Sequence, residues 1–424
     1  MSGASLPKPK TSRNLRWLAL WGPGLLVMLA DCDAGNVVTA AQAGAQWGLQ
    51  LLVVLLVLIP LLYMVQELTV RLGIFAGCGH GELIRSNFGP VWAWISAAGL
   101  VIAVLGSLVT EFTGVAGIGE MYGVSRSLTL PLAVFALIAV VLTGSHKRVD
   151  KAAILIGAFE LTFFVVAWKA HPDIRNAFRQ IKSLPFGNRQ FGYMAAALIG
   201  ATFNPWMVFY QQAAVADKKL TAQDYGAARA ETALGAVLTQ LLTAAVLVAA
   251  AATLSGDGKP HALESVGEIS DALATVVGPH AGRFLFSAGV LGASMVAAIV
   301  CSLSLAWGLG EVAGYKRSLE DRPTGAPWFY GVYIVSVAGS AYLVWLAPNL
   351  VSLNVAAQVV NALMLPLVVG LLIALSVTSL SGKHRPHGLY LWLVSGVAAL
   401  VSVAAIVGAV SGWMSLAACR LRAR

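Results

Sequence analysis

Charged residues are scarce in this chain of 424 residues: Asp, Glu, Lys and Arg make up 11% of it, whereas hydrophobic residues make up 58%. A soluble globular domain carries roughly 25% charged residues. The mean hydropathy is +0.78. This composition argues against a soluble domain and is typical of an all-α polytopic membrane protein, in which apolar stretches of about 20 residues each cross the bilayer.

Several chemical signatures are also missing. The four cysteines, Cys32, Cys78, Cys301 and Cys419, show no C-x-x-C spacing, so they indicate neither a disulfide framework nor a zinc site. There is no Walker A motif and no H-E-x-x-H, which argues against ATP as the energy source and against a membrane enzyme. The net charge of +9 comes from basic residues in short loops, which set membrane topology. We therefore expect no cofactor and no nucleic-acid partner.

Hydropathy predicts eleven membrane-spanning helices. Their expected ranges are 17–47, 48–70, 93–121, 127–144, 151–169, 191–216, 231–255, 281–312, 328–346, 354–379 and 388–412. The first range is too long for one straight span, so we expect that helix to be broken.

The distribution of Lys and Arg predicts the orientation. With the N-terminus in the cytoplasm, 17 of the 28 basic residues fall on the inside, in line with the positive-inside rule. The loop Lys169–Arg189 carries five of the others and contradicts the rule locally. We read residues 1–16 as a cytoplasmic tail, because no A-x-A cleavage site is present and further spans follow. The expected location is the plasma (inner) membrane, with the C-terminus outside.

Eleven spans can be grouped as five, five and one. Residues 17–169 would form a first repeat and 191–379 a second, inverted repeat, separated by an extracellular loop at 170–190. Residues 380–424 would hold the last span and the C-terminal end. Inverted repeats of this kind carry interrupted helices at matching positions, and the substrate site lies between them.

Two interruptions appear at matching positions. The first span contains "DCDAGN" at residues 31–36, and the sixth contains "GATFNPW" at residues 200–206. Pro205 removes a backbone donor and clashes with the preceding turn. Freed backbone groups at membrane depth are tolerated only where they line a cavity or are buried in protein. The two breaks therefore define a candidate site near the bilayer midplane.

The first break supplies three candidate residues. Asp33 and Asn36, with freed carbonyl groups, form a set of hard oxygens that suits Mg²⁺, Ca²⁺ or Mn²⁺. Alternatively, Asp33 is only the N-cap of the half-helix that begins near Gly35. Asp31 is a second ligand, a vestibule charge that attracts cations, or the partner of a basic group, and the sequence does not choose among these roles.

The second break and two further helices supply the rest. Asn204 offers a side-chain oxygen and Ala201 a freed carbonyl; alternatively, Asn204 forms a hydrogen bond across the break. Glu111 is an acid within the third span that could relay protons, guide cations or pair with a buried base. Gln358 and Asn361 share one face of the tenth span, where they bind the substrate or only hold helices together. Neither broken helix contains a histidine.

These motifs resemble the NRAMP divalent-metal transporters. The resemblance is carried by "GPGLLVMLADCDAGN", "QELTVRLGIFAG", "GATFNPW" and "AQVVNALMLP", and it extends from about Gly22 to Pro366. It implies a LeuT-type fold and a transported divalent metal held by Asp33, Asn36, the Ala201 carbonyl and Gln358. We expect the protein to act as a monomer.

The chain departs from that family at four positions. Ala34 replaces the proline of D-P-G-N, Asn204 replaces a methionine, Trp206 replaces a histidine, and Gly114 replaces the second of two acids three residues apart. Loss of the thioether removes a preference for soft ions, and loss of the acid and the histidine weakens proton coupling. The chain thus resembles the NRAMP-related magnesium transporter branch. We expect Mg²⁺ import, with Mn²⁺ also accepted and without proton coupling.

Three other functions remain open. The first is a proton-coupled Mn²⁺/Fe²⁺ importer, in which Glu111 alone carries protons. The second is a small-molecule transporter in which Asp33 faces an ammonium group. The third is a metal-responsive membrane receptor that does not transport.

Overall fold

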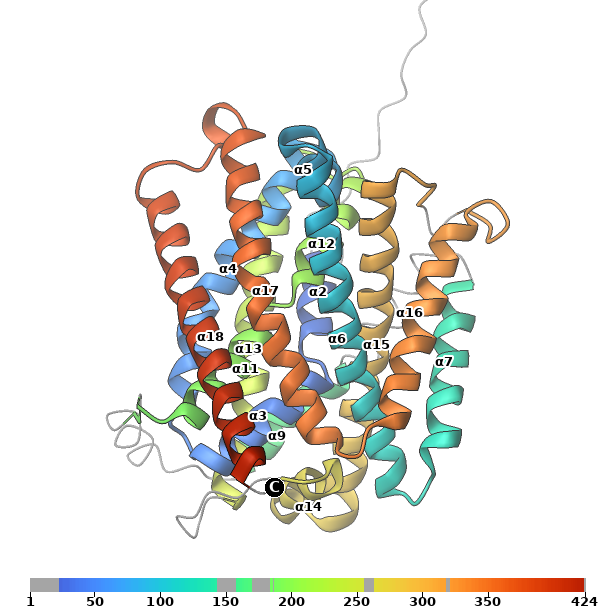
Figure 1. Cartoon of the computed structure of the whole chain (residues 1–424), viewed down its shortest axis with the longest axis vertical. Coiled ribbons are helices and arrows are strands. Elements are labelled where there is room, and N and C mark those ends of the chain that lie inside the picture. The colour runs from blue at the N-terminus through green and yellow to red at the C-terminus, as the bar shows by residue number, and fades with distance from the viewer. Residues whose placement is uncertain are drawn as a thin grey trace, which may run out of the picture.

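The computed structural model describes residues 23–142, 158–169, 184–185, 187–254, 263–317 and 321–422. Within these ranges all regular structure is helical. Figure 1 shows the helices packed side by side as one bundle. The predicted tail 1–16, residues 143–157 and most of the predicted loop 170–190 lie outside the described residues.

The helices follow one another in this order: α2 (Pro23–Asp31), α3 (Ala34–Trp47), α4 (Leu52–Phe75), α5 (His80–Phe88), α6 (Pro90–Met121), α7 (Arg126–Leu142), the 3₁₀ turn η1 (Ala158–Leu161), α9 (Thr162–Lys169), α11 (Arg189–Thr202), α12 (Pro205–Asp217), α13 (Tyr225–Leu254), α14 (Val266–Val277), α15 (Pro279–Ala313), α16 (Pro327–Leu346), α17 (Leu350–Thr378), the 3₁₀ turn η2 (Gly382–His384) and α18 (Gly388–Arg422).

The helices agree with the predicted spans. Seven described helices are long and apolar enough to cross a bilayer alone, and the bent pair α2–α3 is an eighth. Helix α7 is a shorter apolar helix, α11 and α12 together cover the predicted range 191–216, and η1 with α9 covers the described part of 151–169. A described helix thus lies in each of the eleven predicted ranges, and eight of these ranges hold a helix or bent helix pair long and apolar enough to span a bilayer.

Two short helices were not predicted. Helix α5 has 9 residues and α14 has 12, and hydropathy windows of about 20 residues average such segments with the polar residues beside them. Figure 1 places α5 at one end of the bundle and α14 at the other. These are called the α5 end and the α14 end below.

Both predicted breaks are present. Helices α2 and α3 meet at an angle of 46°, and α11 ends at Thr202 while α12 begins at Pro205. Asn204 has an extended backbone, with ψ of 123°, because a following proline disfavours the helical conformation. The pair α2–α3 runs from the α5 end towards the α14 end, and α11–α12 runs in the opposite direction (Figure 1).

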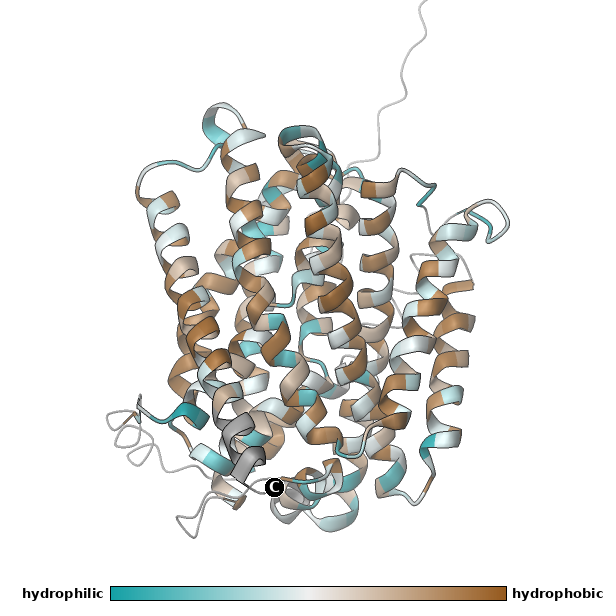
Figure 2. Ribbon diagram, in the orientation of Figure 1, coloured by the Kyte–Doolittle hydropathy of each residue, from teal (hydrophilic) through white to brown (hydrophobic). Residues whose placement is uncertain are grey.

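The outer surface of the bundle is apolar. Figure 2 shows hydrophobic residues along the helices and hydrophilic residues mainly at the two ends and around the breaks. Phe135 on α7 is 71% exposed and Trp392 on α18 is 78% exposed. Large exposed hydrophobic side chains along whole helices indicate a surface that contacts lipid.

The broken helix α11 lies unusually close to α17. A Cβ atom built on Gly200 would lie 1.8 Å from the Gln358 carbonyl oxygen and 2.7 Å from the Ala362 amide nitrogen. Both of these are backbone atoms, which cannot move aside as the end of a flexible side chain can. Only glycine at position 200 therefore allows α11 to bring its break up to α17.

We expect Gly200→Ala to lower the thermal unfolding temperature of the detergent-solubilised protein. Overpacking a close contact typically costs about 1–3 kcal/mol, and here α17 would have to shift. The control is Gly370→Ala, because nothing lies within 4 Å of a Cβ built on that helical glycine. Equal unfolding temperatures for the two variants would contradict this account of the contact.

Candidate metal centre

Asp33 forms the start of the second half of the broken helix. Its backbone is extended, with φ of −80° and ψ of 177°, and its Oδ1 accepts a 2.7 Å hydrogen bond from the Asn36 amide nitrogen. The capping role considered from the sequence is therefore confirmed. A cap uses only one carboxylate oxygen, and Oδ2 of Asp33 has no hydrogen-bond partner among the described residues.

The Asn36 side chain lies at the centre of the site. Its Nδ2 donates to the carbonyl oxygens of Asp31 and Ala201, the latter at 2.9 Å, and lies 3.5 Å from Asp33 Oδ1. Three oxygens from both broken helices thus converge on one amide group. An electropositive –NH₂ group occupies a position whose oxygen neighbours would equally suit a cation.

The break between α11 and α12 supplies the facing side. Asn204 Nδ2 donates to the Ala201 carbonyl at 2.9 Å and lies 3.3 Å from Asp31 Oδ1. The predicted hydrogen bond across the break is therefore present. The Ala201 carbonyl accepts from both Asn36 and Asn204, so both its lone pairs are in use, and these amides must turn before the carbonyl can bind an ion.

Helices α6 and α17 close the site from the side. Asn204 Oδ1 accepts hydrogen bonds from Asn361 Nδ2 at 2.8 Å and from the Ser107 hydroxyl at 3.1 Å. Asn361 Nδ2 also lies 3.0 Å from Gln358 Oε1. Gln358 is packed against the first break as well, since a Cβ built on Gly35 would lie 1.9 Å from its Nε2. Gln358 and Asn361 thus hold α17 against both breaks. This position is compatible with both roles predicted for them, substrate binding and contact between helices.

Glu111 and Asp31 are fully buried beside the first break. Glu111 Oε2 accepts a 3.2 Å hydrogen bond from the Ala34 amide nitrogen, which is one of the donors freed at the start of α3. Asp31 contacts Asn204 and is 0% exposed, so in this structure its side chain does not line an open vestibule. Among the described residues, no ion pair joins either acid to a basic side chain.

Three oxygen atoms in this cluster lack a donor. Among the described residues, Asp31 Oδ2, Asp33 Oδ2 and Asn36 Oδ1 are buried without a hydrogen-bond partner. Buried polar atoms are normally paired, and such exceptions in a native protein point to a bound ion or water. No group of three His, Cys, Asp or Glu side chains that could hold a metal ion occurs in the described ranges. An ion here would therefore depend on amide and backbone oxygens together with the carboxylates.

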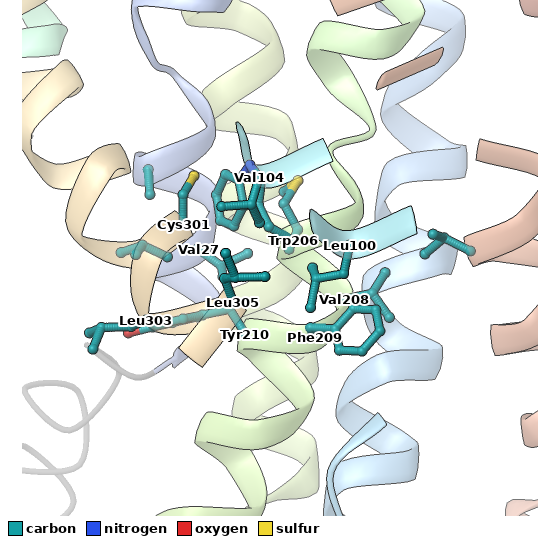
Figure 3. Close-up of a cluster of buried hydrophobic side chains, with 14 of the residues drawn as sticks. Val27, Leu100, Val104, Trp206, Val208, Phe209, Tyr210, Cys301, Leu303 and Leu305 are labelled. Carbon is teal, nitrogen blue, oxygen red and sulfur yellow. The ribbon is translucent and has the colours of Figure 1, made fainter. Parts of the chain in front are cut away.

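Apolar side chains separate the cluster from the α5 end. Figure 3 shows Val27, Leu100, Val104, Trp206 and Leu305 packed together where α2, α6, α12 and α15 meet. All five are at most 3% exposed. A polar ion cannot pass this layer without a rearrangement, so the site is closed on this side.

Sequence reasoning missed Ser107 and Thr110. The Thr110 hydroxyl lies 3.2 Å from Glu111 Oε1, and Ser107 contacts both Asn204 and Asn361. The available signal was the spacing of Ser107, Thr110 and Thr113, which recur every three residues and so share one face of α6. Single hydroxyl residues are common in membrane helices, so this pattern alone is weak.

The fold and the site define a multi-pass membrane protein with two broken helices around a buried oxygen cluster. The sequence profile of the Nramp family (natural resistance-associated macrophage protein-like) matches residues 24–411. The chain therefore belongs to the Nramp family. It is 29% identical over 310 residues to the divalent metal cation transporter MntH 1 of Pseudomonas aeruginosa, which covers 68% of this chain and 69% of that protein.

Solved structures agree on the fold. The manganese transporter of Eremococcus coleocola superposes with a TM-score of 0.72 at 15% identity, covering 96% of this chain and 89% of that one. MhsT in complex with L-phenylalanine superposes with a TM-score of 0.59 at 15% identity, covering 92% of this chain and 98% of that one. The predicted LeuT-type fold is confirmed.

The two roles of Asp33 can be separated by two substitutions. We expect Asp33→Ala to lose both the cap, which is worth about 1 kcal/mol, and the binding of Mn²⁺. We expect Asp33→Asn to retain the cap, because asparagine is an equally good N-cap, and still to lose binding, because the charge is gone. Thermal unfolding measures the cap, and calorimetric titration with Mn²⁺ measures the site. Tight Mn²⁺ binding by Asp33→Asn would exclude the carboxylate as a ligand.

Proposed function

We propose that this protein is a secondary transporter that imports divalent metal ions by alternating access. The observation that carries the proposal is the oxygen cluster at the two helix breaks, in which backbone carbonyl and carboxylate oxygens from both broken helices converge around the Asn36 side chain. Broken helices that face each other near the bilayer midplane are the usual site of substrate binding in transporters of this architecture.

We propose further that Asp33, Asn36, the Ala201 carbonyl, Asn204 and Gln358 bind the ion. Rotation of the amides of Asn36 and Asn204 would turn oxygens towards the Ala201 carbonyl and Asp33. Every ligand in this set is a hard oxygen, which favours Mg²⁺ and Mn²⁺ and gives no advantage to soft ions. Mg²⁺ is then the proposed principal substrate, with Mn²⁺ also transported.

A proton-coupled Mn²⁺/Fe²⁺ importer is the second candidate, and the comparisons favour it. The relatives are named divalent metal cation transporters, and the solved neighbour is named a manganese transporter. In this account Glu111 carries the proton.

Two packing observations support transport without proton coupling. A Cβ built on Gly114 would lie 2.5 Å from Ala34 Cβ and 2.8 Å from Ser294 Oγ, so this contact has no room for a second acid. Trp206 is buried in the apolar layer of Figure 3 and supplies no titratable group there.

We propose that the α5 end faces the cytoplasm. Basic residues concentrate in the connections and the helix ends there: Arg71, Arg85, Lys218, Lys219, Arg229, Lys316, Arg317, Arg322, Lys383 and Arg385. This asymmetry supports a cytoplasmic N-terminus, a C-terminus outside, and placement in the inner membrane. We propose that the monomer is the transporting unit.

Metal flux into liposomes that contain only this protein tests the function. We expect uptake of both Mg²⁺ and Mn²⁺, and little uptake of Cd²⁺, because the site offers oxygen and no sulfur. Transport of Mn²⁺ and Cd²⁺ with no Mg²⁺ uptake would favour the second candidate. Binding of Mn²⁺ without flux would indicate a receptor.

The residue at position 204 should set the ion preference. We expect Asn204→Met to raise the ratio of Cd²⁺ to Mg²⁺ uptake by about tenfold or more, since the thioether adds a ligand that only the softer ion uses. Asn361→Met is the matched control, because it replaces the neighbouring amide side chain with the same thioether. An unchanged ratio in Asn204→Met would exclude residue 204 as a selectivity ligand.

A pH-sensitive dye inside the liposomes tests proton coupling. We expect the internal pH to stay constant while Mg²⁺ or Mn²⁺ enters, once the membrane potential is clamped. Acidification that depends on the metal and disappears in Glu111→Gln would establish the proton-coupled candidate instead.

A further inference from the structure

A second polar cluster lies one helical turn from the metal centre, on the side of the α14 end. Asn354 on α17 joins Thr39 on α3 and Thr113 on α6: its Oδ1 accepts from the Thr39 hydroxyl at 3.4 Å, and its Nδ2 donates to the Thr113 hydroxyl at 3.0 Å. All three side chains are 0% exposed. We call Thr39, Thr113 and Asn354 the clasp.

The clasp spans helices from both repeats. Helix α3 is half of the first broken span, α6 belongs to the same repeat, and α17 belongs to the second. The Thr113 hydroxyl in turn donates a 2.6 Å hydrogen bond to the Thr110 carbonyl of its own helix. The clasp therefore links the helix that carries Asp33 to the two helices that flank the site.

A further layer covers the clasp. One turn beyond Thr39, Gln42 Oε1 accepts a 2.9 Å hydrogen bond from the Leu263 amide nitrogen, immediately before α14. Val266 and Ile269 of α14 are at most 2% exposed, and Val266 fills the space beside Gly117 on α6. The route from the α14 end to Asp33 is thus closed first by α14 and then by the clasp.

The chemistry of the clasp suits a gate. It consists only of neutral amide and hydroxyl groups, so opening it does not separate charges. A hydrogen bond between side chains in a membrane protein contributes on average only about 0.6 kcal/mol. Once separated, these groups offer oxygen atoms to a hydrated cation moving towards Asp33. The side chains of Val27, Leu100, Val104, Trp206 and Leu305, on the side of the α5 end, contain no oxygen atom.

We propose that the clasp is the gate on the α14 side: its hydrogen bonds hold the site closed, and the ion enters from that end when they break. The proposal rests on the proposed transport function. It assigns Thr39, Thr113 and Asn354 as positioning residues that act on access, and none of them as a ligand of the bound ion.

Isosteric variants weaken the clasp in steps. Thr113→Val removes one of the two hydrogen bonds that join the clasp residues, together with the bond to the Thr110 carbonyl within α6. Asn354→Leu removes both bonds of the clasp. Because apparent affinity falls with the fraction of molecules in the open state, loosening the closed state should lower the apparent KM for external Mn²⁺. We expect a decrease of about threefold for Thr113→Val and about eightfold for Asn354→Leu, with a lower maximal rate in both because closure is weaker.

The matched control is Thr243→Val. Thr243 on α13 is 1% exposed, and among the described residues its hydroxyl bonds to the Thr239 carbonyl of its own helix alone, so its loss should leave KM unchanged. A KM that rises in the clasp variants would identify these residues as ion ligands. If the clasp variants had the same KM as Thr243→Val but a lower unfolding temperature, the clasp residues would contribute to helix packing alone. Either result overturns the proposal.

A second measurement does not require transport. Cys32 lies between Asp31 and Asp33 in the sequence, and it is 0% exposed with a free thiol. We expect a small water-soluble thiol reagent to modify Cys32 faster in Asn354→Leu than in Thr243→Val, as peptide mapping can measure in detergent. Equal modification rates in the two variants would overturn the proposed gate, whatever the flux assay shows. Faster modification in Asn354→Leu would support the gate even if the flux assay showed no metal transport.

Discussion

Polar groups at the depth of a bilayer must find their partners inside the protein, because lipid supplies none. Each of the two helix breaks frees backbone donors and acceptors at that depth, and the site exists because the two breaks satisfy one another. The Ala201 carbonyl freed on α11 accepts a hydrogen bond from Asn36 on α3, and the Ala34 amide freed on α3 donates one to the Glu111 carboxylate on α6. The same groups that stabilise the breaks are the ones that could bind an ion.

This arrangement depends on close contact between helices. Because Gly35 and Gly200 have no side chains, α3 can approach the Gln358 side chain and α11 can approach the Gln358 backbone. The resulting cluster has more acceptors than donors, since carboxylate oxygens of Asp31 and Asp33 remain unpaired among the described residues. An excess of buried acceptor oxygen is the property that a divalent cation can satisfy.

Much of this could be predicted from the sequence. Apolar runs locate the spans, because a bilayer imposes their length. The motifs around Asp33 and Asn204 locate the breaks, because carboxylates are costly within a span and because Pro205 removes a backbone donor next to Asn204. Helices α5 and α14 could not be found this way, since a helix of 12 residues or fewer leaves little signal in a hydropathy window. The hydrogen bonds of Ser107 and Asn354 were also out of reach, because they depend on how α6, α12 and α17 face one another, which neutral polar residues do not encode in their spacing.

The central claim is that oxygen atoms at the two breaks, without sulfur, hold the ion. X-ray absorption spectroscopy of the protein loaded with Cd²⁺ tests it most directly, because cadmium binds sulfur wherever a thiol or thioether is within reach. The account predicts a first shell of light atoms only, and no cadmium signal in Asp33→Asn. A sulfur atom in the first shell, or an unchanged spectrum in Asp33→Asn, would contradict it.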